Sequence, residues 1–320
     1  MKPSCLMLLA GLLASATAQA APSCPGGDFT AFFQAFAEDE ALQKAFTAPS
    51  LVEQRVYPGR KGPQVAVRKL APGLHPDLSW LSVEQLAANQ LAREIQWPDR
   101  VYVRDQLGRT LKALVFTRAD CWTLTRVEDW SPAAALRTGI AGPGAQAMLR
   151  GDAYQAMADG QDPVYPHLFV AALDSYLDAA QQGSSPAAFR AVGLSLSGMA
   201  PRLSNERIEQ LLAGAVDTYP PAGAFLAGFY CDEGEPRPDD TCLHPQKTLQ
   251  ALRQWAATGG EAAFKELGMA YERGAITPAQ PARALACYQQ AIKQGEDWVQ
   301  ADAQRLLEQG VVADEAQPCL

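Results

Sequence analysis

The spacing of apolar residues predicts a buried helix near the start of this chain of 320 residues. Four phenylalanines recur at the three- and four-residue intervals of one helical face: Phe29, Phe32, Phe33 and Phe36. Asp28 precedes them as a cap, and Leu42 and Phe46 carry the pattern on to a predicted break at Pro49. A face built of phenylalanines must be buried, so we expect it to form core rather than a ligand site.

A second helix and several strands follow. Ser82 and Gln85 form a capping box that opens a predicted helix over Val83–Ile95, and Trp97-Pro98 ends it. The period of the pattern then changes to two, and strands are predicted at Val101–Arg104, Leu111–Arg118 and Cys121–Val127, with Gln64–Leu70 as a shorter candidate. Helices followed by an antiparallel meander are typical of an α+β domain.

The second half of the chain is dominated by helix-forming residues. Glycines and prolines interrupt it at Gly160, Gly183, Pro201, Pro220, Gly260, Gly274 and Gly295. Short helices between short turns are the pattern of stacked helical hairpins. The change in composition falls near Ser131-Pro132, so we expect a small α+β domain over residues 21–132 and an α-helical domain over 133–320.

Sliding this half over itself by forty residues shows a repeat. The offset superposes Gly228 on Gly268 and Gly234 on Gly274, and it brings Tyr230 within one place of Tyr271. The better copy also holds Leu267, Ala284, Tyr288, Ala291 and Gly295. Small residues let two helices approach, large ones fill the space between repeats, and glycines end helices at positive φ, so we expect all of these residues to be structural. Residues 144–218 resemble degenerate hairpins of the same stack.

The better copy is similar to the Sel1-like repeat. Leu267–Gly274 matches Leu-Gly-x-x-Tyr-x-x-Gly, and Ala284–Gly295 matches Ala-x-x-x-Tyr-x-x-Ala-x-x-x-Gly. The resemblance implies an all-α solenoid of Sel1/TPR-like helical hairpins. The run from Asp28 to Leu51 resembles the start of small exported domains of the NTF2-like cone type, which implies a fold and not a function, because such domains include both enzymes and binding modules.

The first twenty residues have the order of a secretory signal peptide. Lys2 begins a positive region, Leu6–Leu13 is apolar, and Ala18-Gln19-Ala20 places small residues before a cleavage point at Ala21. That order favours a signal peptide over a buried core helix, and the apolar run is shorter than the roughly 20 residues of a membrane span. No second long apolar run follows. We therefore expect export to the periplasm without stable membrane insertion.

Charge and cysteines narrow the partners. After cleavage the chain would hold 26 basic and 35 acidic side chains, a formal charge of −9, which would repel nucleic acid. Six cysteines would remain, and their spacing suggests one of several connectivities: Cys24–Cys121, Cys231–Cys242 and Cys287–Cys319. A metal site is disfavoured because no C-x-x-C occurs and the histidines lie far apart in the sequence: His75, His167 and His244. We expect no cofactor.

No enzyme motif is present. The chain lacks G-x-S-x-G, H-E-x-x-H and the phosphate-binding G-x-x-x-x-G-K-[ST], so it is predicted not to be an enzyme. A catalytic triad assembled from distant residues stays open at this point.

The segment between Cys231 and Cys242 is the candidate partner-binding site, and we call it the acidic link. It contains one arginine and five carboxylates, which are Asp232, Glu233, Glu235, Asp239 and Asp240. A disulfide at its ends would fix its shape before binding. The alternatives are a solvated loop tied down for stability and a calcium site, although the regular ligand spacing of a calcium loop is missing.

Three functions fit these observations. The first is a protein-binding scaffold. An exported α+β head joined to Sel1-like repeats resembles the periplasmic immunity proteins of type VI secretion phospholipase effectors of the phospholipase D type. That resemblance implies binding and inhibition of such an effector, whose lysine- and histidine-lined site an acidic surface would attract. The second is a Sel1-like adaptor in cell-envelope assembly or regulation. The third is an NTF2-like enzyme or small-ligand binder.

Overall fold

The structure, a computed structural model, describes residues 23–60, 62–136, 139–159, 166–235, 241–260, 262–314 and 316–320. The predicted signal peptide and its cleavage point lie outside these ranges. So do two carboxylates of the acidic link, Asp239 and Asp240.

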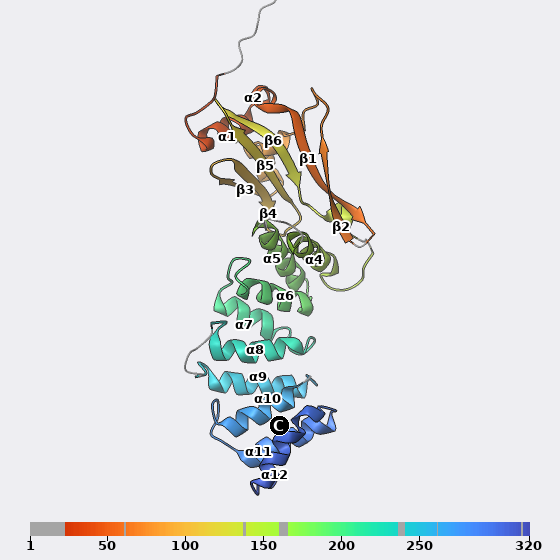
Figure 1. The fold of residues 1–320 in the computed structure, drawn as a ribbon, viewed down its shortest axis with the longest axis vertical. Coiled ribbons are helices and arrows are strands. Elements are labelled where there is room, and N and C mark those ends of the chain that lie inside the picture. The colour runs from red at the N-terminus through yellow and green to blue at the C-terminus, as the bar shows by residue number, and fades with distance from the viewer. Residues whose placement is uncertain are drawn as a thin grey trace, which may run out of the picture.

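The N-terminal part is built on a six-stranded sheet (Figure 1). Its strands are β1 Thr47–Gly59, β2 Gly62–Lys69, β3 Leu91–Gln96, β4 Arg100–Asp105, β5 Leu111–Arg118 and β6 Trp122–Asp129. Their order is β2-β1-β6-β5-β4-β3, and every neighbouring pair is antiparallel except β1 and β6. The predicted meander from β4 to β6 is present, and β1 adds a parallel partner to its last strand.

Short helices cover one face of this sheet: α1 Phe29–Glu38, α2 Glu40–Ala45 and α3 Val83–Ala88. Asp28 begins α1, and its Oδ1 accepts a hydrogen bond from the backbone N–H of Ala31 at 2.8 Å. All four phenylalanines of α1 are fully buried, as predicted, and their rings contact Phe116 and Trp122 of the sheet. Aromatic rings therefore fill the space between α1 and the sheet.

Two predictions in this region are wrong. The helix expected over Val83–Ile95 ends at Ala88, because Gln90 adopts a φ of 55° and the alternating pattern that follows forms the edge strand β3. The break expected at Pro49 falls inside β1 instead. Pro49 lies where the register between β1 and β6 shifts, a place where a strand tolerates a residue that has no N–H to donate.

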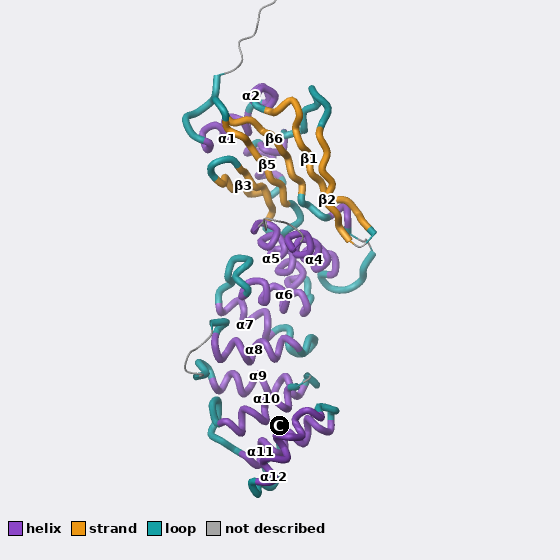
Figure 2. The backbone as a smooth tube through the Cα atoms, in the orientation of Figure 1, coloured by secondary structure: helices purple, strands orange, loops and turns teal. Residues whose placement is uncertain are grey.

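The C-terminal part is a stack of helices that extends away from the sheet (Figure 2). It consists of α4 Ala145–Asp159, α5 Pro166–Gln181, α6 Ser185–Leu196, α7 Asn205–Ala213, α8 Pro221–Asp232, α9 Pro245–Ala257, α10 Ala263–Arg273, α11 Pro281–Lys293 and α12 Gln300–Glu308. Consecutive helices pack as hairpins, α4 with α5, α8 with α9 and α10 with α11, and α12 covers the far end. The predicted succession of helical hairpins is present.

The sheet and the stack share one core. Tyr102, Leu111 and Trp130 of the head lie in a single apolar cluster with residues of α4 and α5. The turn between β4 and β5 docks on α5, where a Cβ at Gly108 would come within 2.5 Å of the Ala171 carbonyl oxygen. Arg150, buried on α4, donates to the carbonyl oxygen of Leu107 at 2.8 Å. These contacts hold the first hairpin against the head.

The structure contains the same three disulfides that the spacing suggested. Cys24–Cys121 ties the segment before α1 to the turn before β6, Cys231–Cys242 closes the acidic link, and Cys287–Cys319 joins the C-terminal segment to α11. In the described ranges, none of the helices combines the length and the apolar character that crossing a membrane requires.

Candidate functional site

Two hairpins of the stack pack through a glycine and a tyrosine. A Cβ at Gly268 of α10 would lie 2.4 Å from Cε1 of Tyr288 on α11, so only glycine fits there. A Cβ at Gly151 of α4 would meet Cε1 of Tyr176 on α5 at 2.5 Å. The hairpins α4–α5 and α10–α11 are therefore the same structural unit.

The tyrosine hydroxyls of these units end on equivalent partners. The Tyr288 hydroxyl bonds Glu272 at 2.9 Å, four residues after Gly268. The Tyr176 hydroxyl lies 3.0 Å from Gln155, four residues after Gly151. Burial, followed by the hydrogen bond to Glu272, raises the pKa of Tyr288 above its usual value. Both rings are thus fixed at their polar ends.

The repeat in α4–α5 was detectable in the sequence, because Gly151 and Tyr154 are spaced as Gly268 and Tyr271 are. In α5 and the turn after it, the series Ala172, Tyr176, Ala179 and Gly183 matches Ala284, Tyr288, Ala291 and Gly295. The interpretation of residues 144–218 as degenerate hairpins overlooked this match. Among the other residues expected to be structural, Leu267, Tyr271, Ala284, Tyr288 and Ala291 are buried, and Gly274 and Gly295 have positive φ.

The middle hairpin, α8–α9, corrects the offset of forty residues. Glu233 and Gly274 are the left-handed residues that end α8 and α10, so the offset between these helices is 41 residues. Ala227, and not Gly228, therefore takes the place of Gly268. Counted in the same way from Gly259 and Gly295, Leu252 takes the place of Tyr288. The smaller Leu252 explains why this hairpin accepts an alanine.

The offset error also changes the roles of two glycines. A Cβ at Gly228 would meet no described residue outside its own turn of helix within 4 Å, so Gly228 is not the close-packing glycine that the offset predicted. Gly234 follows the helix-ending residue, has a φ of 78°, and packs on Leu196, which a Cβ would approach to 2.8 Å.

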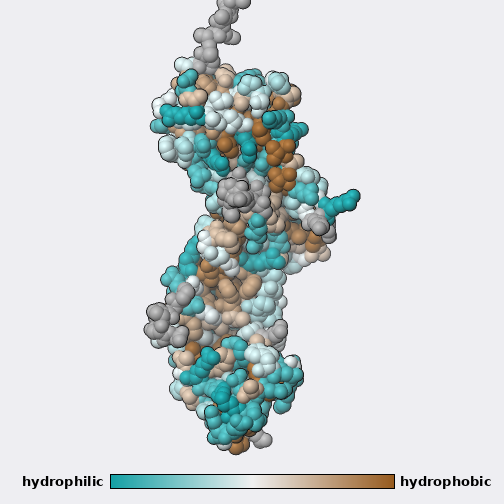
Figure 3. All heavy atoms as spheres, viewed as in Figure 1, coloured by the Kyte–Doolittle hydropathy of each residue, from teal (hydrophilic) through white to brown (hydrophobic). Residues whose placement is uncertain are grey.

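An apolar groove of about 960 Å³ crosses the stack between α6 and α8, and we call it the inner groove. Its walls come from α6, α8, and single residues of neighbouring segments: Phe189, Leu196, Pro220, Pro221, Ala224, Phe225, Gly228, Phe229, Asp232, Gly234, Trp255 and Ala262. A shallower hollow of about 430 Å³ shares Ala224, Gly228 and Trp255 with it. On the face drawn in Figure 3, apolar atoms gather over the middle of the stack, while its C-terminal end is mostly hydrophilic.

Half-buried aromatic rings form part of the groove wall. The Phe189 and Phe225 rings meet edge to face with centroids 5.4 Å apart, and the centroid of the Tyr219 ring also lies 5.4 Å from that of Phe189. Neither phenylalanine is fully buried. Rings that are held in place but partly open to solvent are suited to contact an apolar partner.

Two glycines within helices face open space. Gly193 of α6 lies four residues after Phe189 and three before Leu196, on the same helical face. A Cβ at Gly193, like one at Gly228, would meet nothing within 4 Å. Glycine inside a helix costs about 1 kcal/mol relative to alanine. At these two positions no described residue occupies the space that the missing Cβ leaves.

The structure separates the residues of the acidic link. Asp232 lines the inner groove, and its Oδ1 accepts from the backbone N–H of Gly234 at 2.7 Å. Glu233 is used internally, because it accepts from Asn205 at 2.6 Å and lies 3.2 Å from His244. Glu235 is exposed. Of the three carboxylates of the acidic link that the structure describes, Asp232 is the one that lines the groove.

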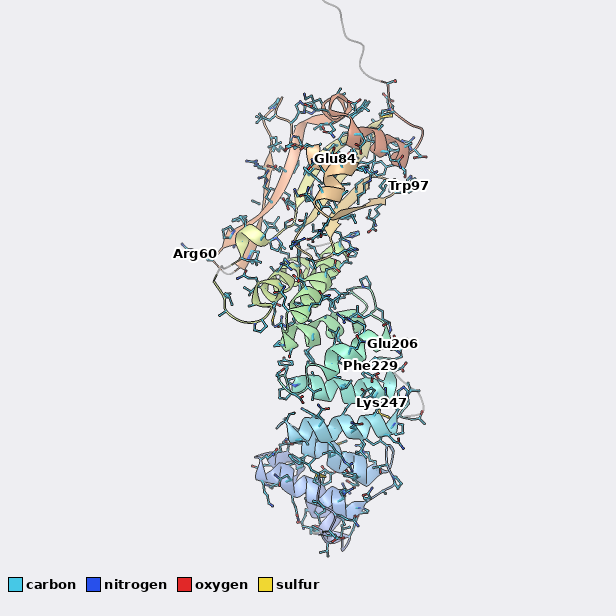
Figure 4. All side chains as sticks on the ribbon, turned by 180° about the vertical axis from the view of Figure 1, so that it is seen from behind. Arg60, Glu84, Trp97, Glu206, Phe229 and Lys247 are labelled. Atoms are coloured by element: carbon cyan, nitrogen blue, oxygen red, sulfur yellow. A yellow bond between two sulfur atoms is a disulfide. The ribbon has the colours of Figure 1, made fainter. Side chains whose placement is uncertain are left out.

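A polar cluster joins α7, α8 and α9 at one edge of the stack, where Figure 4 labels Glu206, Phe229 and Lys247. Glu209 accepts hydrogen bonds from the Tyr230 hydroxyl and from Lys247, both at 2.9 Å. These two bonds lower the pKa of Glu209, and burial together with the same bond raises the pKa of Tyr230 to about 12. The cluster links the helices around the groove, and its polar groups are hydrogen-bonded to one another.

Across the described ranges, no group of three or more His, Cys, Asp or Glu side chains is arranged to hold a metal ion. The prediction that the chain is not an enzyme stays a prediction.

These features define a class of protein: a small α+β head joined to a stack of helical hairpins with an apolar groove in its surface. No protein-family profile matches the chain, and no curated protein matches it. A Sel1 repeat protein from Oxalobacter formigenes is similar in structure, with a TM-score of 0.42 and 21% identity over 53% of this chain and 68% of its own.

A second solved structure is a protective antigen present in uropathogenic Escherichia coli strains, described as displaying an SLR fold. It aligns with a TM-score of 0.42 and 20% identity over 54% of this chain and 35% of its own, so this chain spans about a third of that antigen. The equivalence of the hairpins α4–α5 and α10–α11 rests on their glycine–tyrosine packing and not on these similarities.

Proposed function

We propose that this chain is an exported, non-catalytic scaffold that binds a partner protein in its inner groove. The observation that carries the proposal is the groove itself, which has a volume of about 960 Å³ and a mostly apolar wall between α6 and α8. Contiguous apolar surface of this kind, bordered by polar residues, is typical of interaction sites on soluble proteins. Three disulfides and a shared core would keep the shape of the groove before the partner arrives.

We further propose that the partner is a phospholipase effector of type VI secretion and that the chain is its periplasmic immunity protein. The charge distribution supports this. Residues 21–132 hold 13 acidic and 13 basic side chains, whereas residues 133–320 hold 22 acidic and 13 basic ones. A formal charge of −9 therefore lies on the stack and none on residues 21–132, and it would steer a partner whose active site is lined by lysine and histidine.

Neutralisation of the effector tests this function. A phospholipase of this class is directed to the periplasm of a host cell with and without the full-length chain, and survival and phospholipid hydrolysis are measured. We expect the chain to protect the cells and to co-purify with the effector. An effector that keeps its full activity and does not co-purify would contradict immunity, and a resident envelope protein bound in its place would favour the adaptor.

The contribution of the acidic link is tested separately. Asp232→Asn, Glu235→Gln, Asp239→Asn and Asp240→Asn are combined, and Glu233 is left intact because Asn205 and His244 contact it. The matched control removes four exposed carboxylates of the head: Glu40, Glu84, Glu94 and Asp120. We expect the link variant to slow association at low salt and the control to leave it unchanged. Equal association rates would remove the link from the mechanism.

A small-ligand role of the head is the second candidate. A hollow of about 330 Å³ lies beside the sheet, lined by Glu53, Arg68, Trp80 and Lys112 among others. Gln54, also in its wall, is buried, and its Nε2 has no hydrogen-bond partner among the residues that the structure describes. Thermal shift of the protein against a panel of small metabolites tests this role, and a shift of wild type that Gln54→Leu abolishes would support it.

A further inference from the structure

We infer that the inner groove binds one apolar segment of a partner protein, followed in its sequence by lysine or arginine, with the partner backbone passing over Gly228. This inference rests on the proposed scaffold function and specifies which chemistry the groove accepts. It commits to a protein segment with apolar anchors and a basic end.

The apolar part of the inference follows from the groove wall. The Phe189 and Phe225 rings are half-buried and fixed against each other, and Leu196 extends the same surface along α6. A side chain placed here would contact these residues and lose part of its contact with water. Anchors of this kind are aromatic or large aliphatic residues, which carry most of the affinity in protein interfaces.

The close approach of a backbone follows from the glycines. At Gly151, Gly268 and Gly223 the space of the missing Cβ is occupied by Tyr176, Tyr288 and Trp255 of the chain. At Gly193 and Gly228 no described residue outside the same turn of helix lies within 4 Å of that position. Gly228 lines both the inner groove and the hollow beside it, so a partner segment laid along the groove would reach the α8 backbone here.

The basic part follows from the charge around the groove. Asp232 lines it at the C-terminal end of α8, and Glu235 follows three residues later. The nearby Arg202 donates hydrogen bonds to the carbonyl oxygen of Glu233 and to Asn205. Residues 133–320, which form the stack, carry a formal charge of −9. Lysine or arginine on the partner would be attracted to the Asp232 end.

The same charge argues against a second copy of this chain as the occupant. A symmetric dimer through the groove would bring the same acidic surface of both stacks together. Like charges that face each other across an interface are repelled, and the repulsion is strongest at low salt. A partner of opposite charge meets no such barrier.

The probe for this inference is a phage-displayed library of random peptides, selected on the full oxidised chain. Selected peptides are then measured against wild type, Gly228→Leu, Gly228→Ala, Asp232→Asn and the control Gln250→Leu. Gln250 is exposed on α9 and lines neither hollow. Circular dichroism of each variant verifies folding, and Gly228→Ala keeps the test valid if the leucine disturbs the helix.

We expect selected peptides to share large apolar residues followed by lysine or arginine. Gly228→Leu should weaken their binding by about tenfold or more, Gly228→Ala by a few-fold, and Gln250→Leu not at all. Asp232→Asn should weaken the basic peptides and reduce the salt dependence of binding. Absence of enrichment, an acidic consensus, or equal binding by Gly228→Leu and Gln250→Leu would each overturn the inference. So would a dimer of the chain, seen by sedimentation, that Gly228→Leu dissolves.

The two proposals fail separately. If the effector binds and is neutralised by Gly228→Leu as well as by wild type, the immunity function stands and the groove inference falls. If peptides select as expected and no effector binds, the groove stands and the immunity function falls.

Discussion

Two chemically identical substitutions, Gly268→Ala and Gly228→Ala, should change stability in opposite directions. At Gly268 the new Cβ would lie 2.4 Å from Cε1 and 2.7 Å from Cδ1 of Tyr288. The Tyr288 ring is fully buried, and its hydroxyl is held by Glu272 at 2.9 Å, so the ring cannot turn away without losing that bond. At Gly228 the new Cβ would meet nothing.

The magnitudes follow from two terms. Alanine in place of glycine stabilises a helix interior by about 1 kcal/mol, and this term applies to both sites. Overpacking a filled core costs about 1–3 kcal/mol, and a contact more than 1 Å too short by ordinary van der Waals distance belongs at the upper end of that range. We therefore expect Gly268→Ala to lose about 2 kcal/mol and Gly228→Ala to gain about 1 kcal/mol.

Urea unfolding with the disulfides intact measures both, followed by circular dichroism, with the midpoint compared at an unchanged slope. A matched control is Gly268→Ala combined with Tyr288→Leu, which copies the Ala227 and Leu252 pair of the middle hairpin. It should be less destabilised than expected from the sum of the single changes. Equal effects of the two glycine substitutions, or a loss of stability at Gly228, would refute the reasoning and leave Gly228 as a structural residue.

Three further outcomes are expected. Burial raises the pKa of the Asp174 carboxyl to about 6 despite its ion pair with Arg104, so the folded state binds the carboxyl proton more tightly than the unfolded state does. The free energy of unfolding, relative to that of Asp174→Asn, should therefore fall by about 2 kcal/mol as the pH rises from about 4 to about 6 and then stay level. Urea titrations at each pH measure it. Arg150→Ala removes bonds to Asp178 and to the Leu107 carbonyl oxygen, so it should cost about 3 kcal/mol or more and expose the turn between β4 and β5 to limited proteolysis. Arg207→Ala, at a half-buried position of α7, should change stability little. Replacing Cys287 and Cys319 by serine opens a loop of 32 residues and should cost about 3–4 kcal/mol, with faster hydrogen exchange confined to α11 and α12; uniform exchange across the stack would contradict the local role.

Periodic patterns were the most informative part of the sequence. The phenylalanine stripe of α1 specified its own burial, because four large apolar residues on one helical face leave no alternative in water. The strands β5 and β6 followed from alternation for the same reason. By contrast, the edge strand β3 continues from a capped helix through one left-handed residue, Gln90, and nothing local distinguishes that residue from a helical one.

The groove was not predictable in the same way. Phe189 and Phe225 look like core residues in the sequence, and their partial exposure depends on how far apart α6 and α8 lie in the stack. The acidic link was visible as composition, but its carboxylates serve different purposes. Glu233 ends α8 in the left-handed conformation and binds its neighbours, whereas Asp232 faces the groove one residue earlier.

Glycine has two opposite uses in this stack, and the distinction between them carries the functional argument. Where a tyrosine or tryptophan of the chain lies over the glycine, as at Gly151 and Gly268, the residue closes a hairpin, and its helix cost is offset by packing. Where no described residue lies over it, as at Gly193 and Gly228, no packing contact offsets the free-energy cost of glycine in the helix. Both open glycines lie on the helices that wall the inner groove. A binding surface accounts for that placement, since a partner backbone would supply the contacts that the chain itself lacks.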